Sequence, residues 1–367
     1  MHKVTSAPPD TVELPGRRES LALLDANIPT LAEKTRTQIN GIAKTWQPDD
    51  FLPNLTNAEV AFEDIRAIQR QARSLPPELL VVLVGDAITE DGLPLFTSDL
   101  FTVRGMPSGK KQEGGHGPGD NLKQWFRRWT AEEHRHGALL DAYLRLTGRV
   151  DMGAFERSVQ LFLEDGLDVH ADGDPYKGFV YTSFQELATQ RSHANVARLA
   201  HAHGNPLLAR ICGQIAADEA YHARAYIAFV RTFFQRDPDN MMQALQEMLR
   251  RGIVMPAHNM REVDPSGNVL QPGQTYAYFS NVAQQTGVYT TRDYASISAS
   301  LLRDWNVGQQ NDEGRWTATD FPGLLEGGHA AQQKILRLQG VIERLASSDR
   351  SQPIEPRDTS WLIKKQD

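Results

Sequence analysis

The chain has 367 residues, of which 40% are hydrophobic and 23% are charged, and its formal net charge is −7 at pH 7. This is the composition of a globular protein, and the negative charge argues against general nucleic-acid binding. The single cysteine, Cys212, excludes an internal disulfide framework and any four-thiolate metal site. No apolar run is long enough to span a bilayer and no signal-peptide pattern is present, so we expect a cytoplasmic protein without membrane insertion.

Helical patterning dominates the chain, and alternating strand patterns are scarce. The sequence predicts helices over residues 17–44, 57–73, 78–100, 122–147, 178–203, 206–235, 241–250, 291–305 and 323–345, with a further helix capped by Asp151. Residues 271–278 are rich in turn formers. We expect one all-α domain over residues 1–367, with a flexible N-terminal tail (about 1–18), a Gly-rich loop (104–120) and a polar C-terminal tail (about 347–367).

The pattern Glu-x-x-His occurs four times, at Glu113/His116, Glu133/His136, Glu219/His222 and Glu326/His329. In the first and last, paired glycines separate the two residues, and glycine disfavours a helix interior. The other two lie inside long predicted helices. Because residues three apart on a helix share a face, these two patterns can direct a carboxylate and an imidazole to one point.

Each of the two helical patterns lies on an apolar stripe, where an uncompensated charge is costly. For either stripe alone, a polar pair satisfied by neighbours or water is an adequate explanation. An acid, Glu132 or Asp218, also lies four residues before each histidine and could hold the second ring nitrogen of a metal-ligating imidazole. The sequence leaves open whether that acid reaches the histidine of its own helix or that of the other helix.

Two further acids, Glu90 and Glu186, lie on apolar helices that alternate along the chain with the two Glu-x-x-His helices. This order of Glu, Glu-x-x-His, Glu, Glu-x-x-His is the known pattern of ferritin-like di-iron carboxylate proteins. Four carboxylates also balance two divalent ions, which a dry interior requires. Oxygen and imidazole ligands without thiolate favour iron or manganese.

The stretches that carry these residues resemble the acyl–acyl-carrier-protein desaturase family, of the plant stearoyl type and its bacterial relatives. The matching segments are 46–53, 81–90, 129–137, 178–189, 212–219, 255–258 and 287–290, and the resemblance covers roughly residues 20 to 310. It implies a homodimer of all-α subunits, each with a ferritin-like four-helix bundle core, additional surrounding helices and two iron ions (Fe2+/Fe3+).

The resemblance also implies a function and a site. The expected activity is O2-dependent desaturation of an acyl chain tethered to acyl carrier protein, in fatty acid biosynthesis, with electrons from ferredoxin. The implied metal ligands are Glu90, Glu133, His136, Glu186, Glu219 and His222. Trp46, His136 and Asp218 match proposed electron-relay residues, and Thr189 matches a threonine beside the oxygen-binding face. A core aromatic and a helix hydroxyl bonded to its own backbone are the structural alternatives for Trp46 and Thr189.

Some assignments concern the substrate. An acyl channel needs apolar walls, for which Leu93, Phe179 and Val180 are candidates, although plain core is the favoured interpretation of any one of them. An acidic carrier needs a basic surface, for which Lys110–Lys111, Arg127–Arg128 and Arg250–Arg251 are available. The chain departs from the plant pattern at Asp99 and Val103, where plant members carry more apolar residues.

Two alternatives to desaturation stay open at this point. One is another di-iron oxidation of a carrier-tethered chain, such as hydroxylation or further dehydrogenation in a secondary pathway, which the mass of the product would distinguish. The other is a non-enzymatic ferritin-like metal-binding protein, which would form a large shell rather than a dimer. A radical-bearing subunit like that of ribonucleotide reductase is a weaker possibility.

Overall fold

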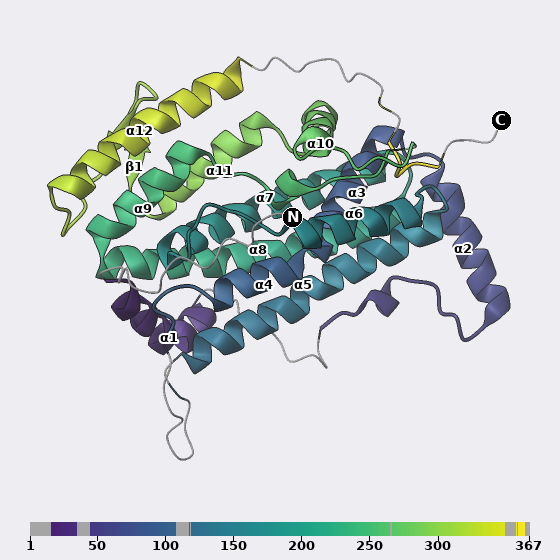
Figure 1. Ribbon diagram of the computed structural model, residues 1–367, viewed down its shortest axis with the longest axis horizontal. Coiled ribbons are helices and arrows are strands. Elements are labelled where there is room, and N and C mark those ends of the chain that lie inside the picture. Colours follow the sequence, from purple (N-terminus) through teal and green to yellow (C-terminus); the bar gives the residue numbers. More distant parts are fainter. Residues whose placement is uncertain are drawn as a thin grey trace.

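The computed structural model describes residues 16–34, 45–107, 117, 119–264, 266–348, 357 and 359–363. Its helices are α1 (Arg17–Lys34), η2 (Pro48–Asp50), α2 (Ala58–Ala72), α3 (Pro77–Asp91), α4 (Leu93–Phe101), α5 (Asp120–Thr147), α6 (Met152–Asp165), α7 (Pro175–Ala202), α8 (Pro206–Arg236), α9 (Pro238–Arg251), η3 (Pro256–Asn259), α10 (Gln274–Thr286), α11 (Thr291–Asp304) and α12 (Glu326–Ser347). Strands β1 (Gly308–Gln310) and β2 (Trp316–Ala318) pair antiparallel. The all-α expectation is confirmed, and Figure 1 shows the helices stacked along one long axis.

Four helices, α3, α5, α7 and α8, form the centre, and the sequence sets their ends. The Asp174 side chain accepts a hydrogen bond from the Tyr176 amide at the start of α7, and Asn205 does the same for Leu208 in α8. Gly148 ends α5 in the left-handed conformation, with φ of +62°. Helices α7 and α8 follow each other through a short turn and pack along their length, beside α5 (Figure 1).

Two apolar clusters fill the interior on either side of a polar belt. On α5, Trp125 and Trp129 belong to the first cluster and Leu140 and Tyr143 to the second. On α8 the order is reversed, so residues 208–215 lie in the second cluster and residues 225–234 in the first. Both Glu-x-x-His patterns therefore lie where the two clusters meet, and the fold buries them by burying their apolar neighbours.

The single helix predicted over residues 78–100 is wrong, because α3 ends at Asp91 and α4 begins at Leu93. Gly92 lies against Phe162, and a Cβ at Gly92 would approach that ring to 2.3 Å. Pro94 has no amide hydrogen to continue the helical ladder. Both α3 and α4 pack against α5.

The turn-rich interpretation of residues 271–278 is also wrong, since α10 starts at Gln274. Gly273 precedes it in the left-handed conformation, with φ of +83°, and directs the chain into the helix. Helix α10 packs against α3. The β1–β2 pair was not predicted, because its strands have only three residues each.

The described ends of the chain are held by specific contacts. Arg17 is buried and bonds the Asp174 carboxylate at 2.9 Å, while Trp361 is fully buried and donates from its indole to Ser158 at 2.9 Å. The predicted loop pairs Lys110–Lys111 and Glu113/His116, and the Leu93 side chain, lie outside the described residues. Among the described helices, none has the length and apolar character that crossing a bilayer requires.

Candidate metal centre

Six buried side chains from the four central helices meet inside the bundle. Helices α3 and α7 each supply one glutamate, and α5 and α8 each supply a glutamate and a histidine three residues later: Glu90, Glu186, Glu133 with His136, and Glu219 with His222. Each is at most 7% exposed. Since positions i and i+3 share a helix face, α5 and α8 direct both side chains of their patterns at the same point.

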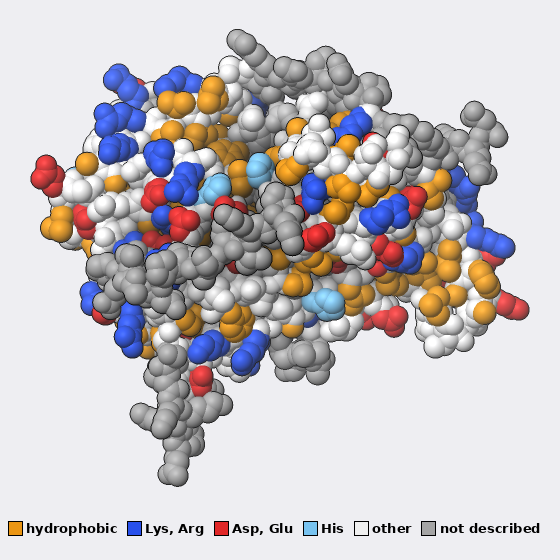
Figure 2. Space-filling view, viewed as in Figure 1, with side chains coloured by type: hydrophobic (Ala, Val, Ile, Leu, Met, Phe, Trp, Pro, Cys, Tyr) orange, Lys and Arg blue, Asp and Glu red, His pale blue; other side chains and the backbone are white. Residues whose placement is uncertain are grey.

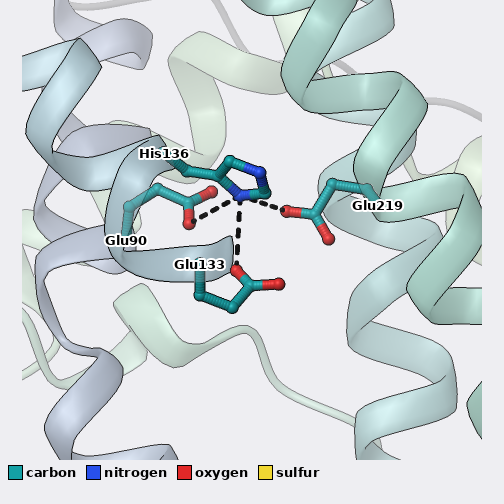
Figure 3. A group of neighbouring side chains, drawn as sticks. All are labelled: Glu90, Glu133, His136 and Glu219. Carbon is teal, nitrogen blue, oxygen red and sulfur yellow. Dashed lines mark ion pairs between the residues drawn. The ribbon is translucent and has the colours of Figure 1, made fainter. Parts of the chain in front are cut away.

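The six residues form two groups of four that share Glu133 and Glu219. Within each group, one potential ligand atom per residue lies within 4.8 Å of the others. In the first group, His136 Nδ1 lies 3.4 Å from Glu133, 3.5 Å from Glu219 and 3.8 Å from Glu90 (Figure 3). The geometry is that of two neighbouring sites with two common carboxylates.

The second group repeats this arrangement around the other histidine. His222 Nδ1 lies 2.6 Å from Glu133, 3.4 Å from Glu186 and 3.6 Å from Glu219. Each group therefore has one imidazole, one carboxylate of its own and the two shared carboxylates. The pattern is symmetric because each Glu-x-x-His helix packs beside a helix that supplies a single glutamate, α5 beside α3 and α8 beside α7.

The acid that precedes each Glu-x-x-His pattern holds the histidine of the other helix. His222 Nε2 lies 2.9 Å from Glu132 of α5, and His136 Nε2 lies 3.4 Å from Asp218 of α8. This answers the question that the sequence left open. A carboxylate that accepts the Nε2 hydrogen leaves the Nδ1 lone pair directed into the cluster, as a metal ligand requires.

Without metal, the cluster holds protons in place of cations. Burial raises the pKa of Glu90 to about 7, and burial with the neighbouring Glu219 and Glu133 carboxylates raises that of Glu186 well above its usual value. Burial alone would lower the pKa of His136 and of His222, but Glu133 and the other surrounding carboxylates raise both well above the ordinary value.

The pKa of Glu219 moves the other way. Burial would raise it, but hydrogen bonds with His136 and His222 hold it well below the usual range. Without metal, protons on the imidazoles and on some carboxylates must balance the negative charge of the buried cluster. Two divalent ions would balance the same charge directly.

The residues present fit a pair of metal ions. His136 Nδ1, His222 Nδ1, a Glu133 oxygen and a Glu186 oxygen are buried and have no hydrogen-bond partner outside the cluster among the described residues. Buried polar atoms are normally satisfied, and these four belong to the same cluster. Oxygen and imidazole donors in this number suit iron or manganese.

Trp46 and Asp218 lie together on the outer side of His136. The Trp46 indole donates to the Asp218 carboxylate at 2.7 Å, and its ring stacks on His136 with 6.0 Å between centroids and 9° between planes. Trp46 is half-buried, so Trp46, Asp218 and His136 form a continuous contact path from the surface to the cluster.

Thr189 follows Glu186 by one turn of α7 and is 8% exposed. Its hydroxyl donates to the backbone carbonyls of Gln185 and Glu186, both at 3.2 Å, as the structural alternative proposed. It also lines a cavity of about 200 Å³, which Glu90 lines as well. Other walls of this cavity come from α10 and the segment after it, including Tyr276, Phe279 and Tyr289.

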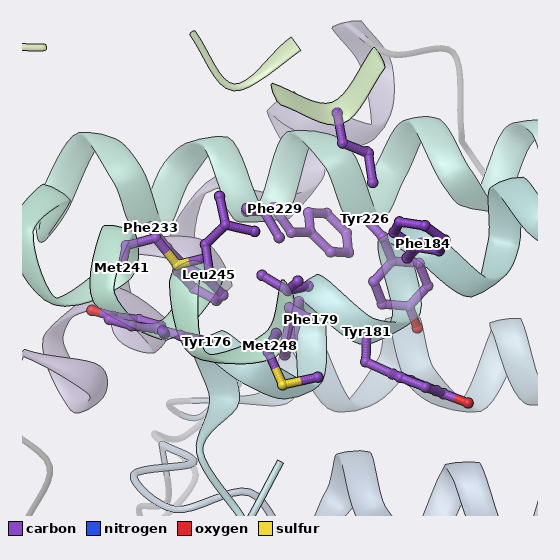
Figure 4. Close-up of a cluster of buried hydrophobic side chains, with 14 of the residues drawn as sticks. Tyr176, Phe179, Tyr181, Phe184, Tyr226, Phe229, Phe233, Met241, Leu245 and Met248 are labelled. Atoms are coloured by element: carbon purple, nitrogen blue, oxygen red, sulfur yellow. The ribbon is translucent and has the colours of Figure 1, made fainter. Parts of the chain in front are cut away.

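Phe179 and Val180 do not line this cavity. Both are fully buried in the first apolar cluster, where Phe179 packs edge-on against Tyr226 and Phe233. The alternative of plain core packing describes both residues in this structure, as Figure 4 shows for Phe179, and their assignment as channel walls stays a prediction. The exposed pair Glu326 and His329 lies in the first turn of α12, far along the chain from the cluster.

The sequence reasoning missed the residues that support the cluster from outside. His193 Nε2 lies 3.0 Å from Glu90, and Arg135 is a buried cation that lies 3.4 Å from Glu132 and 4.0 Å from Asp218. Arg135 also lies over the Trp46 ring at 5.0 Å. His193 could have been found from its position, because it follows Glu186 by seven residues and therefore lies on the same face of α7.

Comparisons with known proteins identify the family. The sequence model of the fatty acid desaturase family matches residues 19–363. A Brassica napus protein named stearoyl-acyl-carrier-protein 9-desaturase, chloroplastic, is 43% identical over 310 residues, which cover 84% of this chain and 72% of the relative. A Simmondsia chinensis protein of the same name is 38% identical over 368 residues, which cover 100% and 84%.

The fold has a counterpart of known structure. The X-ray structure of DesA2 from Mycobacterium tuberculosis H37Rv matches with a TM-score of 0.50 and 19% identity, over 78% of this chain and 94% of that one. At this identity the likeness concerns the fold alone. The match to the family model over nearly the whole chain, and the identity with the plant relatives, show that this chain belongs to the fatty acid desaturase family.

Proposed function

We propose that this protein introduces a double bond into an acyl chain carried by acyl carrier protein, using two iron ions, O2 and electrons from ferredoxin. The observation that supports this most strongly is the buried set of four carboxylates and two imidazoles, in two groups that share Glu133 and Glu219. In this proposal Glu90 and His136 complete one iron site, and Glu186 and His222 complete the other.

The reaction needs a strong oxidant, because an unactivated methylene has no acidic proton for a general base to remove. A reduced pair of iron ions supplies that oxidising power when it reacts with O2. In balance, the substrate loses two hydrogens as it gains the double bond, and O2, two external electrons and two protons complete the formation of two water molecules. The protein holds the acyl chain beside the metal ions, excludes water from the site and provides a route for electrons.

The acyl chain is proposed to enter the cavity of about 200 Å³ that Glu90 and Thr189 line. This cavity touches the cluster directly, since Glu90 belongs to both. Its aromatic side chains, which include Tyr276, Phe279 and Tyr289, offer an apolar surface to a methylene chain. Thr189 lies beside the reacting carbons in this arrangement and would orient O2 at the cluster.

Electrons are proposed to follow Trp46, Asp218 and His136. The indole of Trp46 contacts Asp218 at 2.7 Å, and Asp218 contacts His136 at 3.4 Å, so no gap interrupts the path. Because Trp46 is half-buried, a donor protein can approach its ring from the solvent. We propose ferredoxin as that donor.

The carrier protein is proposed to dock near a basic surface. Arg250 and Arg251 end α9, and both are exposed. Figure 2 shows Lys and Arg side chains gathered over the end of the molecule where α9 and α12 lie. An acidic partner would be steered to such a surface. We also propose a homodimer, which light scattering would report as twice the 41.0 kDa chain mass.

The test is product analysis with iron-reconstituted protein, ferredoxin, its reductase, O2 and a panel of acyl chains on carrier protein. The expected product is two hydrogens lighter than the substrate by mass spectrometry. A product heavier by one oxygen would replace desaturation with hydroxylation. No product from any chain with both iron sites filled would refute the proposal. His222→Ala should abolish turnover, whereas the exposed His201→Ala should not.

A further inference from the structure

Helix α10 has one side that lines the cavity beside the metal cluster and an opposite side that meets the C-terminal segment. Tyr276, Phe279 and Ala283 line the cavity of about 200 Å³. Their helical spacing places them in one stripe. Gln274 and Tyr278 are four residues apart and lie on the opposite side of the same helix. Contacts at these two residues therefore act on the outer side of a cavity wall.

Arg357 of the C-terminal segment makes those contacts. Its guanidinium donates to the Gln274 carbonyl at 3.2 Å. It also lies over the Tyr278 ring, 5.5 Å from the ring centroid, and it forms an ion pair with Glu262. A planar guanidinium has several donors in fixed directions, so one arginine can hold these three partners together.

Glu262 connects the C-terminal segment to a second stretch of the cavity wall. Its carboxylate is 1% exposed, and besides pairing with Arg357 it accepts from the Ser360 amide at 3.0 Å and from the Ser360 hydroxyl at 2.8 Å. A buried carboxylate is costly unless a cation and hydrogen-bond donors compensate it. Met255 and Ala257 precede Glu262 in the chain and line the same cavity as α10. Arg357 therefore joins two stretches of chain that both form the cavity wall.

The C-terminal segment is itself fixed to the helix bundle. Trp361 is fully buried, and its carbonyl accepts from the Asp151 amide at 2.8 Å. The Ile363 amide donates to the Arg149 carbonyl at 3.1 Å. Figure 1 shows this segment in yellow at the same end of the molecule as α2 and α3. Its contacts reach from the junction of α5 and α6 to the outer side of α10.

The position of α10 determines how closely the cavity wall can follow an acyl chain. On its inner side α10 packs against α3, where a Cβ at Gly85 would approach the Phe279 ring to 2.2 Å. On its outer side Arg357 holds it. Dispersion attraction falls steeply with distance, so a gap of about 0.5–1 Å between wall and chain loses about a quarter to a half of each contact.

We propose that Arg357, together with Glu262, is a positioning residue that holds α10 against the acyl chain and so sets the affinity for that chain. The inference rests on the proposed function, since it takes this cavity as the acyl-chain site. Arg357 neither lines the cavity nor belongs to the metal cluster. Metal binding and the rate of the chemical step should therefore not depend on it.

The test compares Arg357→Leu with the unmodified protein, both loaded with iron. Without reductant, acyl chains on carrier protein should bind about tenfold more weakly, and the amides of α10 should exchange hydrogen faster, while the iron content stays the same. During turnover KM should rise about tenfold and kcat should stay within about twofold. The matched control is Arg66→Leu, which breaks an exposed ion pair with Glu63 on α2 and should change none of these quantities.

A second variant, Arg357→Lys, decides the question if Arg357→Leu does not fold. Lysine keeps a positive charge beside Glu262 but lacks the planar fork that reaches the Gln274 carbonyl and the Tyr278 ring together. It should weaken binding about threefold and also speed exchange in α10.

Three results would overturn the inference: unchanged exchange of α10 in the variant that folds, faster exchange with unchanged affinity, or a loss of iron or of kcat as large as the loss of affinity. In each case desaturation by the unmodified protein would leave the proposed function standing. If the unmodified protein binds and desaturates no acyl chain, the proposed function fails and the inference fails with it.

Discussion

Filling the cluster with two metal ions at pH 7 should release protons, on the order of one or more per chain. Without metal, the surrounding carboxylates raise the pKa of His136 and of His222 well above the ordinary value, and burial with neighbouring carboxylates does the same for Glu186. Glu90, with a pKa of about 7, is half protonated at that pH. All four must lose their protons to act as ligands. Overall affinity for the metal pair should therefore rise with pH near neutrality, by about tenfold per unit of pH for each proton that is released.

Calorimetric titration of the metal-free protein with Fe2+ under anaerobic conditions, in buffers of different ionisation enthalpy, measures this release. Glu186→Gln gives a matched comparison, because glutamine has no proton to lose, so the count should fall by about one. His201→Ala, at an exposed histidine, should leave the count unchanged. Release of less than about one proton, or affinity that does not change between pH 6 and 8, would refute the electrostatic account of the cluster.

Other consequences follow from neighbouring residues. Asp218→Asn removes the carboxylate that holds His136 and should weaken iron binding about 10- to 100-fold, measured as bound iron at limiting supply; unchanged occupancy would contradict this. Arg135→Gln removes a buried cation beside the cluster and should make the reduction potential more negative in a potentiometric titration; a rise would argue against the effect. Trp361→Ala should lower the free energy of unfolding in urea by about 3–5 kcal/mol, whereas a loss under about 1 kcal/mol would mean that the C-terminal contact is weak.

The long central helices could be predicted because residues next to their ends in the sequence determine where they begin and end. Pro206 after a capping Asn205, and Gly148 after α5, mark boundaries that tertiary packing does not move. The break at Gly92 was missed although Gly92 and Pro94 are helix-breaking residues in the sequence; only the close approach of Phe162 from α6 depends on tertiary packing. The start of helix α10 was missed because the turn formers Pro272 and Gly273 directly precede it, and the helix itself packs against α3.

The candidate site also combines features that one helix determines with features that depend on how the helices pack. Spacing on α5 and α8 placed glutamate and histidine on one face, which is a property of any helix. The exchange of partners, with Glu132 on His222 and Asp218 on His136, depends on how two helices face each other and is not encoded in either helix alone. The neighbours of an apolar residue also depend on how the helices face each other, since Phe179 packs against Tyr226 and Phe233 of α8.

The central claim is that the four helices hold a pair of metal ions, and anomalous diffraction from a crystal of the iron-loaded protein tests it most directly. The account predicts two iron positions per chain, one bonded to His136 Nδ1 and the other to His222 Nδ1, with Glu133 and Glu219 reaching both. A single iron position, or iron held by residues outside this cluster, would contradict it.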